Sequence, residues 1–334
     1  MRVIAGKHRG AVLSEFTASN IRPTADRTKE SVFNIIANML PGSACLDLFC
    51  GTGNLGIEAL SRGAREVVFV DNSSDSVRLT KKNLDKVKES ANVYLSDAVS
   101  FLKKTDRKFD VIFIDPPYAS DVSVTAVKTI AELDLLTEGG IIVLERDVSV
   151  DCAFDGFSVY DVRKYGKAVV SFIRKTKKCL FAGTFDPFTL GHEEVVKAVI
   201  KKYDEVYVVI MENNLKKPVF NEEERVEIVR KSLEKYDKTI ISSWNGMLVD
   251  FMKENKIAVN VRGIRDDADK EYEKKMEEYN RGLYPEIVYE YVYTDSSISS
   301  SLVREKLAKC DDISQFVQKN ALKYIYNAYN NKAK

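Results

Sequence analysis

The sequence predicts an α/β protein made of two consecutive, doubly wound domains. The chain has 334 residues, which is more than one hydrophobic core usually organises. A glycine-rich turn, GTGNLG at 51–56, joins a strand pattern to a helix pattern near the start, and a second such turn, GTFDPFTLGH at 183–192, occurs past the midpoint. We therefore expect one domain at 1–174, a linker at 175–178 and a second domain at 179–334.

The composition is typical of a folded protein without a membrane segment. Hydrophobic residues make up 45% of the chain and charged residues 30%, which is enough apolar material for packed cores. No apolar run approaches the ~20 residues that span a bilayer, and the opening residues MRVIAGKHRG lack the apolar stretch of a signal peptide. We expect a cytoplasmic protein with no membrane partner. The five cysteines form no CxxC pair and no ligand spacing with the two histidines, so no protein-made metal site is expected.

The net charge of +1 is nearly balanced, so any surface that binds nucleic acid must be local. The first thirty residues hold such an excess, with three acidic residues against six basic ones: Arg2, Lys7, Arg9, Arg22, Arg27 and Lys29. A basic arm of this kind can neutralise phosphates, and an ordinary solvated face has the same charges.

The first domain begins with a strand, helix and strand at 44–50, 54–63 and 65–71. Gly51, Gly53 and Gly56 lie between the first strand and the helix, in the spacing that permits a tight turn and close approach of a ligand. Asp71 ends the second strand, where a carboxylate can bond both hydroxyls of a ribose. This pattern fits NAD, FAD and S-adenosylmethionine equally well.

The segment FDVIFIDPPYAS distinguishes these candidates. Its strand at 111–114 ends at the carboxyl edge of the sheet, where open α/β folds bind ligands, and four residues follow: Asp115, Pro116, Pro117 and Tyr118. Asp115 and the Pro116 carbonyl can accept hydrogen bonds from an amine, and Tyr118 offers a face on which a base can stack. The two prolines favour a rigid, extended loop. The chemistry indicated is transfer to an exocyclic amine of a base.

Together with MRVIAGKHRG, RPTADRTKESVFNII, LDLFCGTGNLGIEALSRGA and KYGKAVVSFIRK, these motifs resemble the RsmD-type 16S ribosomal RNA guanine-N2 methyltransferases over 1–174. The resemblance implies a class I S-adenosylmethionine methyltransferase sheet. It implies that Asp47 and the glycine loop hold the methionine part of S-adenosylmethionine, Asp71 the ribose and Asp97 the adenine edge. Residues 115–118 would hold the guanine, and Arg22, Thr24, Asp26 and Arg27 would help arrange 16S rRNA, free or in an assembling small subunit. An adenine-N6 DNA methyltransferase is the competing hypothesis, but no DNA-recognition insertion is visible.

The second domain repeats phosphate-binding features at the ends of strands. A strand at 179–182 leads to a helix that begins near Thr189 or Gly191, and His192 lies at this anion-binding end. Lys216 follows the strand at 205–211, and Arg262 and Arg265 flank Gly263 near the end of another strand. Serines at 299–301 begin a further helix. These phosphate-binding residues suit direct nucleotidyl transfer, in which His192 donates a hydrogen bond to the α-phosphate and magnesium assists.

The motifs GTFDPFTLGH, KKPVFNEEERVEIV, RGIRDDADKEYE and ISSSLVRE resemble those of phosphopantetheine adenylyltransferase, CoaD. The resemblance implies a second Rossmann-like domain and a homo-oligomer formed through it. It implies contacts to 4'-phosphopantetheine from Thr184, Lys216, Leu248 and Arg262. It implies contacts to ATP from Thr184, Phe185, His192, Gly263, Ile264, Arg265, Glu273, Ser299, Ser300 and Ser301.

Two departures leave alternatives open. Ala182 replaces a common proline, and the stretch between YPE and ISSS is about three residues short and lacks the usual bulky residue. The second half could therefore be a scaffold that has lost catalysis, or a nucleotidyltransferase with another acceptor. Cytidylyltransferases and the nicotinate mononucleotide enzyme share GTFDP and GH but differ in the serine and acceptor motifs.

Overall fold

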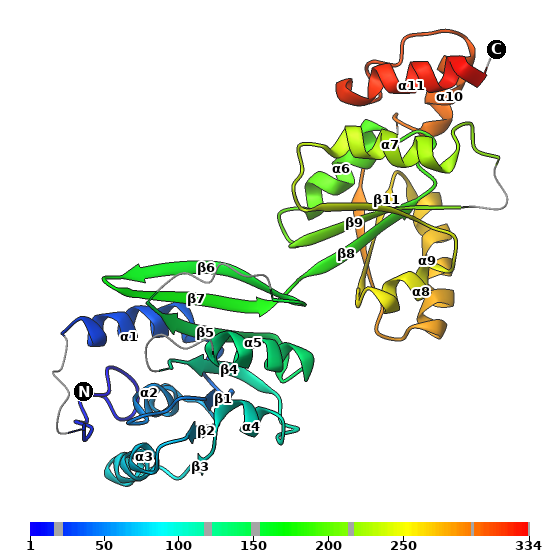
Figure 1. Ribbon diagram of the computed structural model, residues 1–334. Coiled ribbons are helices and arrows are strands. Elements are labelled where there is room, and N and C mark those ends of the chain that lie inside the picture. The colour runs from blue at the N-terminus through cyan, green and yellow to red at the C-terminus, as the bar shows by residue number, and fades with distance from the viewer. Residues whose placement is uncertain (17–22, 117–121, 148–153, 213–216, 295–296, 333–334) are drawn as a thin grey trace. The chain divides into compact units, whose positions relative to one another are not determined.

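The computed structural model describes residues 1–16, 23–116, 122–147, 154–212, 217–294 and 297–332. The chain divides into two compact units, Met1–Lys175 and Thr176–Lys334 (Figure 1). Only Thr176 and Lys177 lie between the last strand of the first unit and the first strand of the second.

The first unit is built on a seven-stranded sheet in the order β3-β2-β1-β4-β5-β7-β6. The pairs that join β3, β2, β1, β4 and β5 are parallel, and β7 pairs antiparallel with β5 and β6. The strands are β1 (Ala44–Asp47), β2 (Glu66–Asp71), β3 (Asn92–Leu95), β4 (Phe109–Ile114), β5 (Leu136–Arg146), β6 (Phe157–Tyr165) and β7 (Ala168–Lys175).

Helices cover both faces of this sheet because alternate residues of a strand point to opposite faces. Cys45 and Phe69 pack with α1, α2 and α3, whereas Leu46 and Ile112 pack with α4 and α5. The helical elements are α1 (Pro23–Ile35), the 3-10 turn η1 (Ala37–Met39), α2 (Asn54–Ser61), α3 (Ser74–Val87), α4 (Ala98–Leu102) and α5 (Val122–Glu132).

The second unit is built on five parallel strands in the order β10-β9-β8-β11-β12. They are β8 (Lys178–Gly183), β9 (Glu205–Met211), β10 (Thr239–Trp244), β11 (Val259–Ile264) and β12 (Val288–Tyr293). Because all five run in one direction, their carboxyl ends share one edge, where loops can form a site.

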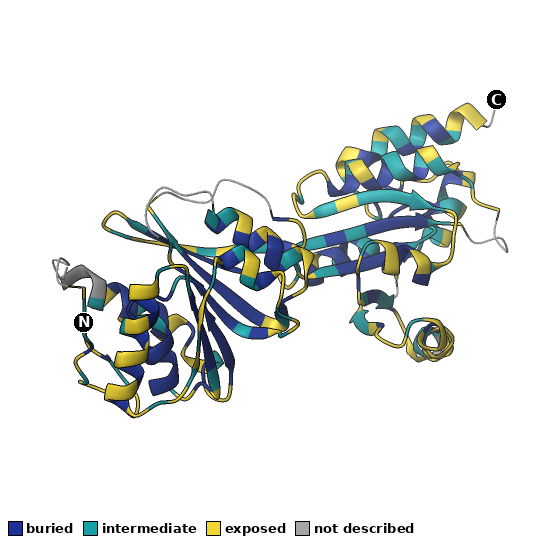
Figure 2. Cartoon of the chain, turned by 60° about the horizontal axis from the view of Figure 1, so that its bottom comes forward, coloured by how far each residue is buried: buried dark blue, intermediate teal, exposed yellow. Residues whose placement is uncertain are grey.

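Two layers of helices enclose this second sheet. Phe181 packs on one face with α6, α7, α10 and α11, and Leu180 packs on the other with α8. Figure 2 shows the result in both units, with buried residues along the strands and exposed ones on the outer faces of the helices. The helices are α6 (Leu190–Val199), α7 (Glu222–Leu233), α8 (Leu248–Glu254), α9 (Asp267–Leu283), α10 (Ser300–Ala308) and α11 (Lys319–Lys332). Among the described residues, no helix is both long enough and apolar enough to span a membrane.

Candidate active sites

The glycine loop of the first unit connects β1 to α2. Gly51 and Gly53 have φ angles of +52° and +78°, in the left-handed region that favours glycine. Gly56 lies inside α2, and a Cβ placed there would come 2.2 Å from Cε1 of Phe69 on β2. The first two glycines therefore form the turn, and the third lets the helix approach the sheet.

Two aspartates brace this loop. Asp47 ends β1 and is buried, and its Oδ2 accepts the Gly56 N–H at 2.9 Å. Asp71 ends β2 half-buried, and its Oδ2 accepts the Gly51 N–H at 2.9 Å. Burial raises the pKa of Asp47 to about 7, the Gly56 hydrogen bond opposes the shift, and the nearby Asp71 carboxylate adds to it. Asp97 is exposed and caps α4 by accepting the Ser100 N–H.

A second pair of acids lies at the carboxyl ends of β4 and β5. Ile114 is paired with Leu144, so Asp115 and Glu145 occupy the next positions on neighbouring parallel strands. Asp115 is exposed when the whole residue is considered. The protein around its carboxylate nevertheless desolvates that group, and this desolvation, with the negative charges of Glu145 and Asp47, raises the pKa of Asp115 to about 8. Burial also raises the pKa of Glu145. Pro116 is half-buried, and Pro117 and Tyr118 lie outside the described residues.

Glu145 did not emerge from the sequence. Its only signal there is a charged residue at the end of the apolar segment GIIVLE, which is common in strands that reach a surface. Its proximity to Asp115 depends on the pairing of β4 with β5.

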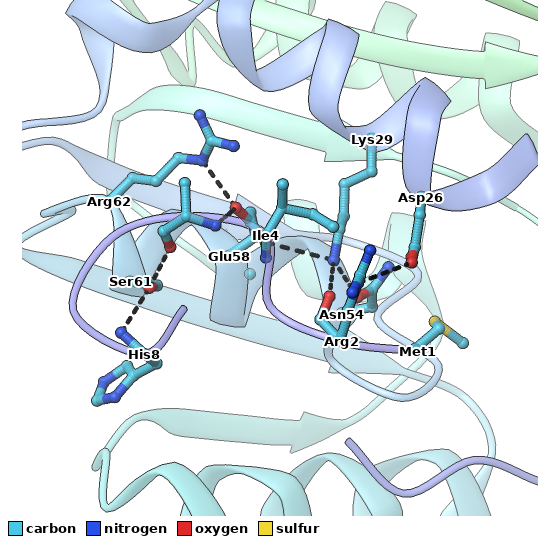
Figure 3. Close-up of polar contacts among 12 residues, drawn as sticks. Met1, Arg2, Ile4, His8, Asp26, Lys29, Asn54, Glu58, Ser61 and Arg62 are labelled. Atoms are coloured by element: carbon cyan, nitrogen blue, oxygen red, sulfur yellow. Dashed lines mark hydrogen bonds and ion pairs between the residues drawn. The ribbon is translucent and has the colours of Figure 1, made fainter. Parts of the chain in front are cut away.

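A buried polar cluster ties the N-terminal segment to α2 (Figure 3). Glu58 is fully buried and accepts hydrogen bonds from the backbone N–H groups of Ile4 and Ala5 at 2.7 and 3.0 Å and from Nε of Arg62 at 2.8 Å. Lys29 Nζ lies 3.3 Å from Glu58 Oε2. The first residues of the chain are therefore held against the helix that follows the glycine loop.

Lys29 corrects one expectation. The sequence predicts that Lys29 belongs to an exposed basic arm, but it is only 4% exposed and donates to Asn54 Oδ1 at 2.8 Å and to the Arg2 carbonyl at 2.6 Å. Burial lowers its pKa, and the Glu58 carboxylate opposes that shift. Arg27 is exposed and Asp26 lies 3.4 Å from Arg2, while Arg22 and the Thr24 side chain lie outside the described residues.

In the second unit, His192 lies in the first turn of α6. Its Nδ1 accepts the Thr189 backbone N–H at 3.0 Å, so the proton of the neutral ring is on Nε2, which can donate. Burial and the positive charges of Arg265 and Arg262 lower the pKa of His192 to about 4, so the ring is neutral near pH 7. The rings of Phe181, Phe185 and Phe188 surround it, with centroids 5.1 to 6.2 Å away.

Arg262 is held in place from two directions. Its Nε and Nη2 donate to the Glu273 carboxylate on α9 at 2.8 and 2.6 Å, and its Nη1 donates to the Ala182 carbonyl of β8 at 2.7 Å. A bidentate pair of this kind fixes the plane of the guanidinium. Arg265 follows the buried Ile264 and is exposed, with an Asp269 oxygen 2.9 Å from its Nε.

Gly263 lies between the two arginines. A Cβ there would come 2.9 Å from Cγ2 of Val195, so the glycine lets α6 lie close to β11. This packing brings the N-terminal turn of α6, and therefore His192, to the same sheet edge as the arginines.

The serines begin α10 and contact the loop after β8. Ser299 caps the helix by accepting the Leu302 N–H at 3.1 Å, and Ser300 Oγ donates to the Pro187 carbonyl at 2.9 Å. Ser301 is exposed and lies 3.1 Å from Nη2 of Arg304. The structure thus brings the serine motif to the GTFDPFTLGH loop, more than a hundred residues away in the sequence.

The remaining sequence-predicted residues are Thr184 and Leu248, both half-buried, Phe185, which is buried, and Lys216, which lies outside the described residues. Leu248 begins α8. Arg225 of α7 was missed by the sequence reasoning; it is 1% exposed and donates from Nη1 to the Thr184 carbonyl at 3.0 Å.

The two structural units match two different families of known proteins. The family described as Conserved hypothetical protein 95 matches residues 1–174, and the family described as Cytidylyltransferase-like matches residues 180–306. The first half is similar to the Haemophilus influenzae ribosomal RNA small subunit methyltransferase D, with 37% identity over 152 residues, which cover 44% of this chain and 79% of that protein.

The second half is similar to two phosphopantetheine adenylyltransferases. The Petrotoga mobilis protein is 39% identical over 142 residues, which cover 42% of this chain and 88% of that protein. The Shouchella clausii protein is 36% identical over 156 residues, which cover 45% of this chain and 98% of that protein.

Proposed function

We propose two enzymatic activities from the premise that the chain belongs to the Conserved hypothetical protein 95 family over residues 1–174 and, in its second half, to the phosphopantetheine adenylyltransferases. The first unit methylates the N2 amine of a guanine in 16S rRNA, with S-adenosylmethionine as methyl donor. The second unit transfers the adenylyl group of ATP to 4'-phosphopantetheine, which gives dephospho-coenzyme A and pyrophosphate.

The acids around the glycine loop support the proposal that the first unit transfers a methyl group. S-adenosylmethionine supplies an electrophilic methyl group on a positively charged sulfur, and a desolvated carboxylate such as Asp47, with its pKa raised to about 7, is stabilised by a cation. Asp71 keeps unused lone pairs for a ribose. We propose that Gly51, Gly53 and Gly56 shape the cradle and that Asp97 lies at the adenine edge.

At the other end of the site, Asp115 and Pro116 would receive the guanine, together with Pro117 and Tyr118. Asp115 accepts one N–H of the amine and holds the nitrogen lone pair towards the methyl group, which is mainly a matter of positioning. When the N–C bond forms, the sulfur keeps the electron pair of the broken C–S bond and the nitrogen loses a proton. Asp115 can take that proton, because its pKa is raised to about 8.

His192 supports the proposal that the second unit transfers an adenylyl group. Its Nδ1 is occupied by the Thr189 N–H, so Nε2–H can donate to the α-phosphate of ATP as charge builds during attack by the acceptor phosphate. We propose that Arg265 and the serines at 299–301 bind the other phosphates, and that Phe185, Gly263, Ile264 and Glu273 complete the ATP site. Thr184, Lys216, Leu248 and Arg262 would bind 4'-phosphopantetheine.

Magnesium and self-association complete the proposal. The described residues hold no group of three or more His, Cys, Asp and Glu side chains that could bind a metal ion, so Mg²⁺ would be held largely by the substrate phosphates. An exposed apolar stripe on α9 supports a homo-oligomer through the second unit: Tyr272, Met276, Tyr279 and Leu283.

The test uses the purified full chain and two variants that serve as controls for each other. Methyl transfer from labelled S-adenosylmethionine is measured on unmethylated small-subunit particles, and pyrophosphate release is measured with ATP, Mg²⁺ and 4'-phosphopantetheine. Asp115→Ala should lose only methyl transfer, and His192→Ala should lose most of the pyrophosphate release while methylating normally. Pyrophosphate release that does not need 4'-phosphopantetheine would point to another acceptor, and no release at all would leave the second unit as a scaffold.

A further inference from the structure

Glu145 is a half-buried carboxylate at the candidate methylation site, and the mechanism above does not use it. It is the next residue after Leu144, whose partner on β4 is Ile114, so its neighbour at the edge of the sheet is Asp115. Its backbone pairs with Val170 of β7, but among the described residues its carboxylate makes no hydrogen bond or ion pair. A partly buried acid without a cation usually has another partner, since desolvating a carboxylate is costly.

The base expected here presents two donors side by side. An unstacked guanine offers N1–H and the N2 amine on its Watson–Crick edge, and a carboxylate is an acceptor for either. Adenine has an acceptor at N1, which a carboxylate placed opposite that atom would repel. Neighbouring parallel strands lie about 4.8 Å apart, so adjacent side chains can reach adjacent atoms of one base.

We infer that Glu145 selects guanine by accepting its N1–H, while Asp115 accepts from the N2 amine that receives the methyl group. The inference rests on the proposed methyltransferase function and adds a specificity-determining residue to it. It also gives a partner to each of two neighbouring acids whose pKa values burial raises: the base supplies a donor to each carboxylate. The carboxylate of Glu145 further raises the proton affinity of Asp115, as its contribution to the raised pKa of Asp115 shows.

The test compares guanine with 2-aminopurine, which keeps the N2 amine but has a bare acceptor at N1. The target guanine is first mapped by mass spectrometry of RNA methylated by the wild-type chain. Ligation of a synthetic oligonucleotide then places 2-aminopurine at that position, and the RNA is assembled into small-subunit particles. Initial rates of methyl transfer are measured for wild type, Glu145→Gln and the control Glu138→Gln, whose residue is exposed at the start of the same strand.

Wild type should methylate 2-aminopurine about tenfold to a hundredfold more slowly than guanine, because one charge-assisted hydrogen bond is lost. Glu145→Gln should slow guanine methylation about tenfold or more and bring the two bases within about threefold, since the glutamine amide can donate to the bare N1. Glu138→Gln should behave as wild type.

The outcomes separate the inference from the function on which it rests. If Glu145→Gln methylates both bases more slowly but keeps the wild-type ratio, Glu145 has only a structural role and the inference is wrong. A wild-type chain that methylates the two bases equally well also overturns it, while leaving the methyltransferase assignment intact. If wild type binds S-adenosylmethionine but methylates no guanine in the particles, the proposed function itself fails.

Discussion

His192 has two roles in the structure, and substitutions can separate them. Its Nδ1 accepts the N–H of Thr189, a residue that is 1% exposed, in the capping box at the start of α6. Removing the ring in His192→Ala leaves that N–H without its partner, which costs about 1 kcal/mol of unfolding free energy. It also removes the Nε2 donor, which should lower the rate of adenylyl transfer roughly 10²- to 10³-fold, as loss of one transition-state donor does.

Glutamine and glutamate at position 192 separate the two roles of the side chain, which are to accept the Thr189 N–H and to donate a hydrogen bond to the phosphate. Both accept an N-cap N–H well at the third helical position, so His192→Gln should keep the stability of wild type. His192→Glu should be less stable than His192→Gln, because the three surrounding rings desolvate the carboxylate. Glutamine still has an N–H₂ donor for the phosphate, whereas glutamate has none and carries a negative charge. We therefore expect His192→Gln to retain more activity than His192→Ala, and His192→Glu to be the least active of the three.

Two assays measure these quantities separately. Pyrophosphate release reports the rate, and urea unfolding followed by tryptophan fluorescence reports stability, because Trp244 on β10 is the only tryptophan and lies in the second unit. A His192→Ala rate within about threefold of wild type, or a His192→Glu rate equal to that of His192→Gln, would refute the role of the Nε2 donor.

Three further outcomes are expected in the first unit. Gly56→Ala would place a methyl group 2.2 Å from a ring carbon of Phe69, so it should cost about 1–3 kcal/mol of stability and weaken S-adenosylmethionine binding, measured by thermal unfolding and calorimetry. Asp47 has a folded-state pKa of about 7, above the unfolded value of about 3.9, so the folded protein binds the extra proton and stability falls as pH rises between these values. Asp47→Asn should therefore raise the melting temperature at pH 8 more than at pH 5, while S-adenosylmethionine binds more weakly; an equal effect at both pH values would contradict this. Lys29→Met would leave Glu58 buried without its lysine partner and should cost about 3 kcal/mol by urea unfolding, whereas Lys7→Met on the exposed surface should change little.

Local patterns predicted the elements well where a few neighbouring residues decide the conformation. The strand expected at 205–211 is β9, Glu205–Met211, and the helix expected near Thr189 begins at Leu190 with Thr189 as its cap. The first strand was expected to reach residue 50, but it ends at Asp47. Residues 48–50 already lead into the turn at Gly51, whose positive φ is set by the loop as a whole.

The sequence alone determined the alternation of strands and helices, the turns at Gly51 and Gly53, and the helix start near Thr189, because each depends on side chains within a few residues of one another. Only the tertiary structure decided that Lys29 is buried against Glu58 rather than exposed in a basic arm, that Glu145 lies beside Asp115, and that Glu273 pairs with Arg262. These three depend on which surfaces lose water and which strands pair. Desolvation and strand register arise from packing between distant segments, and no local pattern records them.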